Sequence, residues 1–403
     1  MSRCGILVLT TTYPSHQGDW QGAFIHSLIL AIRRKGFEVT VLAPSNGERY
    51  GNHTLDGVQV MRFGYFWPRS LERLTIGAGG IPENISKSFL AKFQIIPMTL
   101  LFIVRALILS KKADIIYSNW IGAGFVGAVA GTITGKPMVV SFRGDDGYLA
   151  RDRTLWRLAT KWVIKKSAYV TAVSSELINI MKDLGADAQR LSTPRFGVDS
   201  EIFYPNCEVR QNRGKLKIIF VGSLIPKKGL QDLIEAMTSP QFANTELIIV
   251  GDGYYGPELK KLANRKLNGR CVEWMGIVPP VKVGEVLRES DILVLPSYTE
   301  GSPNVIKEAM ATALPVIGAR VGGVPELVDH GRTGFLYEPG AIEELRDYLG
   351  KLVEDKDMRL QMGISSRRKL NEAGLDWDST AEDFEKIFLS TLKKVHEKKR
   401  LHG

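Results

Sequence analysis

Two carboxylates, Glu300 and Glu308, are separated by seven residues and follow the apolar run 292–295. If a helix begins between them, Glu308 lies about two helical turns beyond Glu300, so one acid can face a sugar while the other reaches further along the same ligand. The alternative is structural, with Glu300 as a helix-start acid and Glu308 as an exposed helix charge. Backbone groups at the expected helix start can face a phosphate or sugar hydroxyls, and the residues concerned are Gly301, Ser302, Pro303 and Asn304.

A second candidate binding element is the glycine-bounded turn after the apolar run 216–221. A turn that opens a helix presents backbone N–H groups and a positive dipole end, and a lysine there adds a full positive charge. The turn is therefore a candidate seat for a diphosphate, and a basic turn that binds nothing is the alternative. Its main residues are Gly222, Ser223, Lys227, Lys228 and Gly229.

A rival motif occupies Gly251–Gly256. It matches the dinucleotide fingerprint G-x-G-x-x-G after the apolar run 247–250, and Glu273 lies beyond it as an acid. The match predicts an NAD-dependent Rossmann enzyme. Because it falls on the second strand of its domain rather than the first, this interpretation is kept only as the alternative.

Two Asp-x-Asp pairs, Asp355–Asp357 and Asp376–Asp378, raise the question of a metal site. Neither pair follows a core strand. The second precedes the last helix, where acids commonly cap the N-terminus. We therefore expect no metal and no cofactor.

The elements that must position these residues follow from the hydrophobic pattern. Short Val/Ile/Leu runs alternate with longer segments of helical period, which indicates buried parallel strands with crossover helices. Each half is therefore predicted to be a doubly wound α/β sheet, with ligands at the carboxyl ends of the strands and a cleft between two domains. The expected strands are 6–9, 39–42, 115–118, 138–142, 216–221, 247–250, 272–275, 292–295 and 315–318.

The length of 403 residues suits two domains. Segment 203–214 breaks both hydrophobic periods and is interpreted as a linker. We predict a first domain of residues 1–205 and a second of residues 206–378, with a last helix within 379–403.

The net charge of +10 is uneven, since residues 1–200 hold 24 Lys and Arg against 14 Asp and Glu, whereas residues 201–403 hold 29 of each. A basic half can attract nucleic acid, anionic lipid or a phosphorylated substrate, or can simply be a dispersed soluble surface. Zinc-finger, RNA-binding aromatic and dense basic-helix signatures are missing, so no nucleic acid is expected.

The start of the chain does not have the features of a signal peptide, and the apolar region 93–109 is interrupted by Pro97 and Arg105. The expectation is a cytoplasmic protein without a membrane span.

The pattern as a whole resembles the family-4 glycosyltransferases of the GT-B fold, a large retaining family that includes bacterial polysaccharide and lipid glycosyltransferases. The family signature of Glu, seven residues, Glu is matched by Glu300 and Glu308, within the variant Glu-Gly-x-Pro-Asn-Val. The resemblance implies two Rossmann-like domains, with an acceptor-binding first domain onto which the C-terminal helix crosses back and a donor-binding second domain. Further matching segments run along nearly the whole chain, at 12–14, 22–24, 196–199, 228–229, 322–326 and 331–334.

Carried over to this chain, the resemblance assigns roles to particular residues. It implies that Lys228 neutralises the donor diphosphate and that Glu308 hydrogen-bonds the ribose hydroxyls. It makes Glu300, with the amides after it, the contact to the donor hexose. It also assigns Gly276, Ile277 and Val278 to the nucleobase side, and Gly22 to a first-domain loop near the phosphates.

Two departures from the family pattern concern positive charge. Gly222-Ser223-Leu224 stands where the family often has Gly-Arg-Leu, so Lys227 or Arg143 is expected to substitute, or leaving-group stabilisation is weaker. Arg143-Gly144-Asp145-Asp146 stands where the family often has His-Gly-x-Asp. An arginine cannot act as a base near neutral pH, but its planar fork can hold phosphate or sugar oxygens. We assign Arg143 electrostatic and positioning work, with a salt bridge to Asp145 or Asp146 as the alternative.

The function implied by the resemblance is transfer of a hexose from a UDP- or GDP-linked sugar to a hydroxyl of a glycan or lipid-linked acceptor. Retention is expected, with attack on the face from which the diphosphate departs and with the leaving phosphate taking the acceptor proton. The setting would be surface polysaccharide or glycolipid synthesis. A GT-B-like epimerase or phosphorylase, and a non-catalytic scaffold, are the alternatives.

The candidate acceptor surface is the aromatic and basic stretch 63–73, in particular Tyr65, Trp67 and Arg69, together with Asp145 and Asp146. Lys87, Lys92 and the apolar run that stops just before Lys111 and Lys112 follow this stretch. Aromatic side chains of such a surface can enter a headgroup zone and its lysines can meet anionic lipid, so peripheral contact with the inner face of a membrane is one interpretation. The other is that the aromatic side chains pack inside a loop and that 93–109 is a core helix.

Overall fold

The computed structural model describes residues 4–77, 80–206, 214–267 and 269–402. It divides into a first unit of Met1–Phe196 with Trp377–Gly403 and a second unit of Gly197–Asp376. The sequence placed this division near residue 205, but Val198 packs in the core of the second unit, and its amide donates to the Leu375 carbonyl at 3.1 Å. Residues 207–213 of the predicted linker lie outside the described residues.

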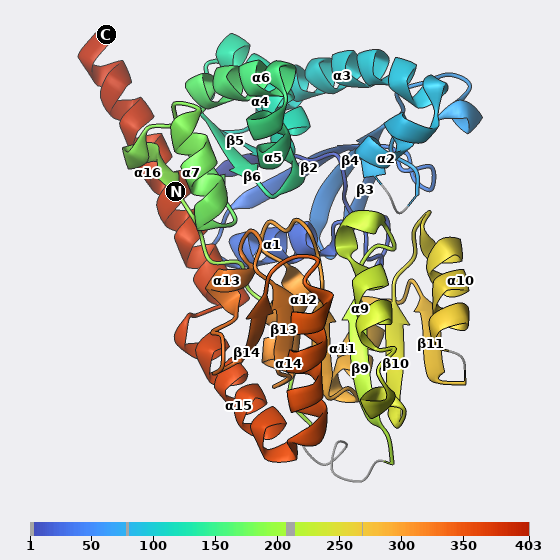
Figure 1. Ribbon diagram of the computed structural model, residues 1–403. Coiled ribbons are helices and arrows are strands. Elements are labelled where there is room, and N and C mark those ends of the chain that lie inside the picture. The colour runs from blue at the N-terminus through green and yellow to red at the C-terminus, as the bar shows by residue number, and fades with distance from the viewer. Residues whose placement is uncertain (1–3, 78–79, 207–213, 268, 403) are drawn as a thin grey trace. The chain divides into compact units, whose positions relative to one another are not determined.

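The first unit is built on an eight-stranded sheet with helices on both faces (Figure 1). The strand order is β3-β4-β2-β1-β5-β6-β7-β8, and β3 and β4 pair antiparallel whereas the other neighbours are parallel. The strands are β1 (Gly5–Leu9), β2 (Glu38–Pro44), β3 (Gly51–Leu55), β4 (Val58–Phe63), β5 (Ile115–Asn119), β6 (Met138–Phe142), β7 (Tyr169–Ala172) and β8 (Leu191–Ser192). The helices are α1 (Ala23–Arg34), α2 (Gly80–Lys87), α3 (Phe89–Ser110), α4 (Trp120–Thr134), α5 (Asp145–Asp152), α6 (Thr154–Lys166), α7 (Ser175–Asp183) and α16 (Trp377–His402), with short turns η1 (Arg69–Leu71) and η2 (Ala188–Arg190).

Strands β1, β2, β5 and β6 confirm the strands predicted in this half. Their side chains are nearly all buried on both faces of the sheet, which is why they form continuous apolar runs in the sequence. The prediction missed β3, β4, β7 and β8. β3 is mostly exposed and polar, and it pairs with β4 in a hairpin around Asp56 and Gly57, so it has no apolar run.

The second unit is a six-stranded sheet, parallel throughout, with the order β11-β10-β9-β12-β13-β14. All five strands predicted in this half are confirmed, and two buried clusters divide β9 between them, with Ile218 and Phe220 in one and Ile219 in the other. The doubly wound α/β class is therefore confirmed. The strands are β9 (Leu216–Val221), β10 (Thr245–Val250), β11 (Cys271–Gly276), β12 (Ile292–Leu295), β13 (Val316–Ala319) and β14 (Gly334–Tyr337). The helices are α9 (Leu230–Ala236), α10 (Gly256–Lys266), α11 (Pro280–Arg288), α12 (Asn304–Ala311), α13 (Val324–Leu327), α14 (Ile342–Glu354) and α15 (Lys356–Glu372), with turns η3 (Pro226–Lys228) and η4 (Pro240–Phe242).

The last helix, α16, packs within the first unit, as the fold resemblance implied. Phe384 meets the Tyr117 ring edge-on, with the ring centroids 5.3 Å apart. Arg195 holds the helix through Nε and Nη2, which donate to the Asp383 carboxylate at 2.8 and 2.7 Å. Aromatic burial and this ion pair together join the end of the chain to its first half.

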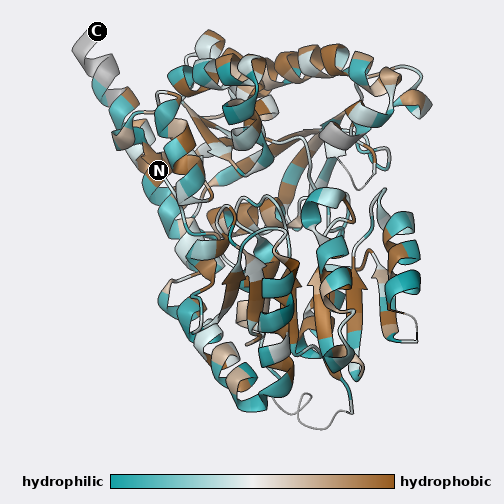
Figure 2. Ribbon diagram, viewed as in Figure 1, coloured by the Kyte–Doolittle hydropathy of each residue, from teal (hydrophilic) through white to brown (hydrophobic). Residues whose placement is uncertain are grey.

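Helix α3 continues for 22 residues through Pro97 and Arg105, further than the sequence indicated. Figure 2 shows mostly hydrophobic residues along it. Among the described residues it is the helix that could cross a membrane by length and hydropathy, a test that core helices of soluble proteins also pass.

Candidate active site

In the second unit, two loops leave the carboxyl ends of neighbouring parallel strands, β9 and β12. Parallel neighbours end at the same edge of a sheet, so their loops meet. The Tyr298 amide donates to the Lys227 carbonyl at 2.8 Å, and the Tyr298 hydroxyl donates to Asp232 on α9 at 2.8 Å. These bonds hold the predicted diphosphate turn against the loop that leads to Glu300.

An ion pair between Lys228 and Glu300 also joins the two loops. The distance from Lys228 Nζ to Glu300 Oε1 is 2.6 Å, and the Ser297 hydroxyl donates to the same oxygen at 2.7 Å. The Glu300 side chain is only 8% exposed, so it is not the surface helix-start acid of the alternative interpretation. Sequence reasoning missed Ser297 as a partner, although it lies three residues before Glu300 in the same motif.

Gly229 allows this close approach of the loops. Its φ is +70°, and a Cβ at this position would lie 1.8 Å from the carbonyl oxygen of Pro296. Any side chain there would force the β9 and β12 loops apart and separate Lys228 from Glu300.

Glu308 lies on α12 with its side chain partly buried. Desolvation raises the pKa of its carboxyl to about 7, and the positive charge of Lys307 opposes the rise. Within the described ranges, the carboxylate has no hydrogen-bond or ion-pair partner. The alternative of an exposed helix charge is therefore wrong, and the group is suited to accept hydrogen bonds from a ligand.

The start of α12 supplies backbone donors beside these acids. Pro303 is the N-cap residue and Asn304 opens the helix. The amides of Gly301, Ser302 and Asn304 donate to no other residue that the structure describes. A helix start with such amides is suited to bind a phosphate or sugar oxygens, and this binding stays a prediction.

The residues at the end of β9 contribute less charge. Gly222 follows the strand directly, and its amide donates to the Val250 carbonyl at 3.0 Å. Ser223 and Lys227 are partly exposed on the same loop, with Lys227 next to Lys228 in η3. Ser223 carries no positive charge at the position where the family often has arginine. Lys227 adds a second positive charge on this loop, next to Lys228.

A cavity of about 440 Å³ lies beside the ends of β10 and β11 in the second unit. Gly276, predicted on the nucleobase side, lines it. Ile277 and Val278 continue toward α11, with Ile277 44% exposed and Val278 packed against the core. Other lining residues are Leu224, Gly251, Asp252, Gly256, Pro257, Lys260, Trp274 and Met275.

The glycines of the rival fingerprint have a packing role. A Cβ on Gly251 would lie 1.9 Å from the Gly222 carbonyl oxygen, and one on Gly253 would lie 2.4 Å from that of Leu224. The β10 loop thus packs against the β9 loop at a distance that only glycine permits. This packing accounts for the two glycines without a dinucleotide.

In the first unit, Arg143 follows β6, and its guanidinium hydrogen-bonds neutral groups. Nε and Nη2 donate to Asn119 Oδ1 at 2.9 and 2.7 Å, and Nη2 also donates to the Tyr117 hydroxyl at 3.1 Å. The guanidinium carbon lies 5.0 and 4.8 Å from the ring centroids of Phe24 and Phe196. In the described part of the chain no carboxylate pairs with this group, so the predicted alternative of a salt bridge is wrong. No sequence pattern indicated that these four neighbours contact Arg143.

Asp146 shapes the Arg143 loop instead. Its Oδ1 accepts the amides of Arg143, Gly144 and Gly147, each at 3.1 Å, and burial raises the pKa of the carboxyl to about 6. With 5% exposure, Asp146 is not placed to contact an acceptor, contrary to the prediction, whereas Asp145 is exposed.

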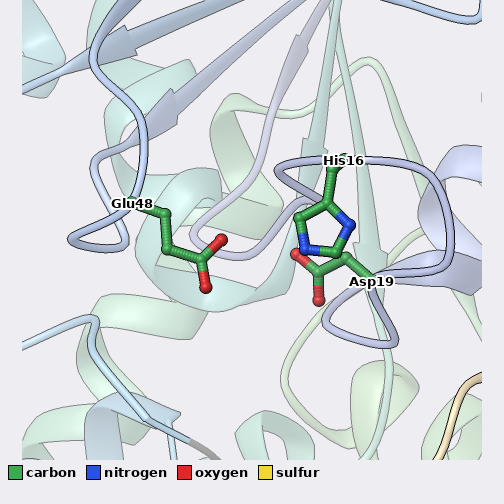
Figure 3. Close-up of side chains that lie close together, drawn as sticks. All are labelled: His16, Asp19 and Glu48. Carbon is green, nitrogen blue, oxygen red and sulfur yellow. The ribbon is translucent and has the colours of Figure 1, made fainter.

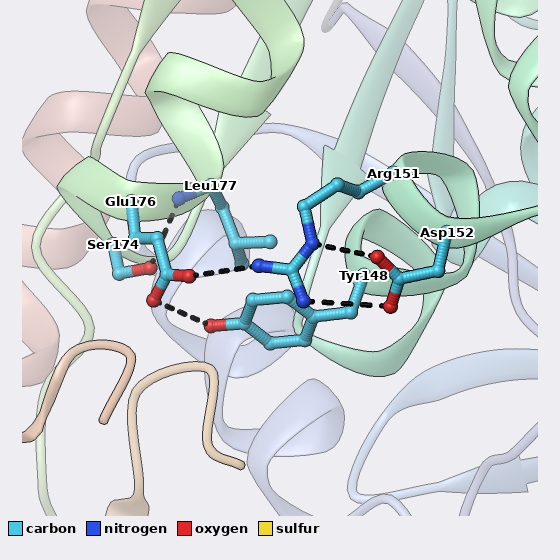
Figure 4. A network of polar contacts seen from close by, with 6 residues as sticks. All are labelled: Tyr148, Arg151, Asp152, Ser174, Glu176 and Leu177. Atoms are coloured by element: carbon cyan, nitrogen blue, oxygen red, sulfur yellow. Dashed lines mark hydrogen bonds and ion pairs between the residues drawn. The ribbon is translucent and has the colours of Figure 1, made fainter.

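Helix α5, which begins in this loop, is tied to α7 by a polar network (Figure 4). The Tyr148 hydroxyl donates to Glu176 at 3.2 Å, and Arg151 bonds both Asp152, at 2.8 Å, and Glu176, at 3.4 Å. Its charges are paired, so the network serves to fix α5 and the loop before it.

The other predicted residues of the first unit are dispersed. Gly22 precedes α1, and its carbonyl accepts the first helical bonds. Tyr65 is 1% exposed and its hydroxyl hydrogen-bonds Thr75 at 2.9 Å, so its prediction as an acceptor contact is wrong. Trp67 is 85% exposed, and the Arg69 guanidinium lies 4.4 Å from the Tyr50 ring centroid.

Figure 3 shows His16, Asp19 and Glu48, whose possible ligand atoms lie within 4.8 Å of one another. The Asp19 carboxylate already accepts two amides of its own loop, at 2.8 and 2.9 Å. His16 and Glu48 are exposed.

In one of the Asp-x-Asp pairs, Asp355 caps α15, because its carboxylate accepts the Met358 amide at 2.8 Å.

Comparisons with known proteins agree with this architecture. A model of "Glycosyl transferases group 1" matches residues 208–369, and a model of a "Glycosyl transferase 4-like domain" matches residues 21–194. The sulfoquinovosyl transferase SQD2 of Arabidopsis thaliana is 28% identical over 354 residues, which are 80% of this chain and 68% of that protein. An Escherichia coli UDP-Gal:alpha-D-GlcNAc-diphosphoundecaprenol alpha-1,3-galactosyltransferase is 28% identical over 289 residues, 66% of this chain and 72% of that protein.

Solved structures share the fold. The crystal structure of Anabaena HepE in complex with UDP and glucose has a TM-score of 0.74 at 20% sequence identity. The match covers 96% of this chain and 100% of the HepE chain. The two family matches take in most of the chain, one in each unit. This chain therefore belongs to the family-4 glycosyltransferases of the GT-B fold.

Proposed function

We propose that this glycosyltransferase moves a hexose from a UDP- or GDP-linked sugar to a hydroxyl of a glycan or lipid-linked acceptor. The transfer proceeds with retention and without a metal ion, in surface polysaccharide or glycolipid synthesis. The observation that carries the proposal is the contact of Lys228 with Glu300, followed along the chain by the desolvated carboxylate of Glu308. One sheet edge thus offers a cation for a diphosphate and two acids for hydroxyls.

In the proposed reaction, the bond between the anomeric carbon and the diphosphate oxygen breaks, and its electron pair leaves with the diphosphate. Lys228 stabilises the charge that develops there, and the diphosphate takes over the lysine from Glu300. The acceptor oxygen bonds the anomeric carbon on the same face, and its proton passes to the departing phosphate oxygen. Retention follows because one bond forms on the face where the other breaks.

Arg143 is proposed to hold phosphate or sugar oxygens at the end of β6. Its guanidinium keeps its charge although burial lowers its pKa, and its hydrogen-bond partners are neutral. The planar group is fixed between Phe24 and Phe196, which suits a positioning role.

The names of similar proteins guide the choice of substrates. The E. coli relative is named for a UDP-galactose donor and a diphosphoundecaprenol-linked acceptor, and the HepE crystals hold UDP and glucose. UDP-sugars and lipid-linked acceptors are therefore the first to test. The NAD alternative rests on the Gly251–Gly256 motif with Glu273 beyond it, and loop packing explains Gly251 and Gly253.

Calorimetric titration with UDP, GDP, ADP and NAD in the presence of EDTA tests the donor site. We expect one nucleoside diphosphate to bind without metal. Tight binding of NAD without binding of any nucleoside diphosphate would contradict the proposal. With a donor in hand, the anomeric proton of the product in NMR spectra decides retention, and an inverted linkage contradicts that part.

The raised pKa of Glu308 predicts a pH dependence with opposite signs for binding and stability. The folded protein keeps a proton on Glu308 between pH 4.5 and about 7 that the unfolded chain has released, so the free energy of unfolding falls as pH rises through this window. Glu308→Gln is therefore expected to be more stable than the wild type at pH 8, by on the order of 2 kcal/mol. Because the ionised carboxylate accepts hydroxyl bonds better, nucleotide affinity should rise from pH 6 to pH 8, and Glu308→Gln should be about tenfold weaker at pH 8.

Denaturation and calorimetry at both pH values measure these effects. The matched control is Glu285→Gln, since Glu285 is an exposed acid of the same unit paired with Lys282. An affinity that falls toward pH 8, or a variant less stable than the wild type at pH 8, contradicts the assignment.

A further inference from the structure

Helix α3 is apolar on two opposite faces. Its outer face carries large exposed side chains at helical spacing, between 51% and 85% exposed, and no other described segment covers them. A helix that is apolar all round is normally enclosed on all sides. The packed inner residues are Ala91, Gln94, Met98, Phe102, Ala106 and Ser110, and the outer ones are Phe89, Phe93, Ile96, Leu100 and Val104.

Neighbouring helices extend this surface. Helix α4 packs against α3, and α6 packs against α4, so the three lie side by side over one face of the sheet (Figure 1). Ile133 on α4 is 66% exposed, and Leu155 and Leu158 on α6 are 82% and 60% exposed. We call α3, α4 and α6 the three-helix face.

The charge of the three-helix face has one sign. Its helices contain no Asp or Glu. Exposed large apolar groups mark an interaction site, and the positive charge around them complements anionic headgroups. A second copy of the chain would place its own positively charged face against this one. The repulsion disfavours a dimer in which the two faces cover each other. The charged residues are all exposed and are Lys92, Arg105, Arg157, Lys161, Lys165 and Lys166.

The inner packing of α3 argues against a membrane span. Gln94 accepts the Arg73 amide at 2.9 Å, and its side-chain amide donates to the Leu71 carbonyl at 2.7 Å. Insertion across a bilayer would break these bonds and the packing on α4, whereas a position in the interface keeps both.

We propose that the three-helix face docks on a bilayer containing anionic lipid, with α3 in the plane of the interface. The inference goes beyond the proposed reaction, because docking needs no sugar donor. For an enzyme with a lipid-linked acceptor, docking would bring the first unit to the surface where that acceptor lies. The three-helix face includes Lys92 and the apolar run that the sequence suggested, adds α4 and α6 to them, and does not involve Tyr65, which is buried.

Sedimentation with vesicles tests the proposal. The wild type should bind vesicles of phosphatidylcholine mixed with phosphatidylglycerol, and bind phosphatidylcholine alone more weakly. The triple variant Phe93→Gln, Ile96→Gln, Leu100→Gln should partition at least about tenfold less, because it removes most of the apolar contact. Lys161→Gln with Lys165→Gln should reduce the preference for phosphatidylglycerol while α3 is unchanged.

The control is Leu360→Gln with Ile364→Gln, which changes two exposed apolar residues of α15, 42% and 59% exposed, and should bind vesicles like the wild type. Nucleotide titration of every variant separates a failure of docking from a failure of the proposed function and shows that the variants fold. No vesicle binding by the wild type, or equal binding by the α3 variant, overturns the proposal. The wild type could instead form a dimer in ultracentrifugation that only the α3 variant loses, and bind no vesicles. That result would show that a second copy of the chain covers the three-helix face, and it would also overturn the proposal.

Discussion

Replacing Lys228 by methionine is expected to lower kcat/KM for the nucleotide-sugar donor by about a hundredfold or more. The ammonium group is the charge in direct contact with Glu300 at the meeting of the β9 and β12 loops. Without it, negative charge on the departing diphosphate loses its stabilising cation in a partly buried site. Steady-state kinetics and nucleotide titration, run side by side, measure the effect on transfer and on binding.

The same change also leaves the buried Glu300 with Ser297 as a hydrogen-bond donor but without its cation, so stability should fall by on the order of 2 kcal/mol. The double variant Lys228→Met, Glu300→Gln separates the two effects, because it restores charge balance without restoring catalysis. Lys266→Met is the matched control, since it breaks a lysine–glutamate pair of 3.2 Å that is exposed on the same unit and contributes little. Activity of Lys228→Met within a few-fold of the control would remove Lys228 from the mechanism.

Replacing Gly229 by alanine is expected to destabilise the second unit by about 3 kcal/mol or more and to abolish tight nucleotide binding. Two costs combine there, the left-handed φ of +70° and the 1.8 Å approach of a Cβ to the Pro296 carbonyl oxygen. Relief requires the β9 and β12 loops to separate, which takes Lys228 away from Glu300. Chemical denaturation gives the stability, and calorimetry gives the nucleotide affinity.

Gly331→Ala isolates the backbone cost. Gly331 has a φ of +77°, but open space surrounds the position where a Cβ would stand. This control should lose only about 1 kcal/mol and keep nucleotide binding. If the two variants lose the same stability, or if Gly229→Ala binds nucleotide normally, the close approach of the loops is not what forms the site.

The candidate residues of the second unit could be picked out from the sequence because they belong to local motifs. Glu300 and Glu308 are fixed by spacing along one loop and helix, and Lys228 by a glycine-bounded turn after an apolar run. That Lys228 and Glu300 touch could not be predicted, because the contact depends on β9 and β12 being neighbours in the sheet, which is a matter of strand order. The raised pKa of Glu308 likewise depends on its desolvation in the folded protein, which spacing along the chain does not specify.

The predictions for the first unit failed where exposure decided the outcome. Tyr65 and Trp67 are two residues apart in one aromatic stretch, yet one is buried and hydrogen-bonded and the other is 85% exposed. Asp145 and Asp146 differ in the same way, since Asp146 turns back to cap the loop. Composition does not distinguish such neighbours, because burial is set by contacts with other segments.

The sequence by itself determined the α/β class, the strands with continuous apolar runs, the return of the last helix through its resemblance to the family, and the candidate motif residues of the second unit. These are properties of short segments, where hydrophobic period and turn chemistry act locally. Only the tertiary structure decided which loops meet, which acids are desolvated and that α3 leaves an apolar face exposed. It also decided that the Arg143 guanidinium contacts aromatic rings and hydrogen-bonds neutral groups. Each of these depends on packing between residues far apart in the chain, which no local pattern specifies.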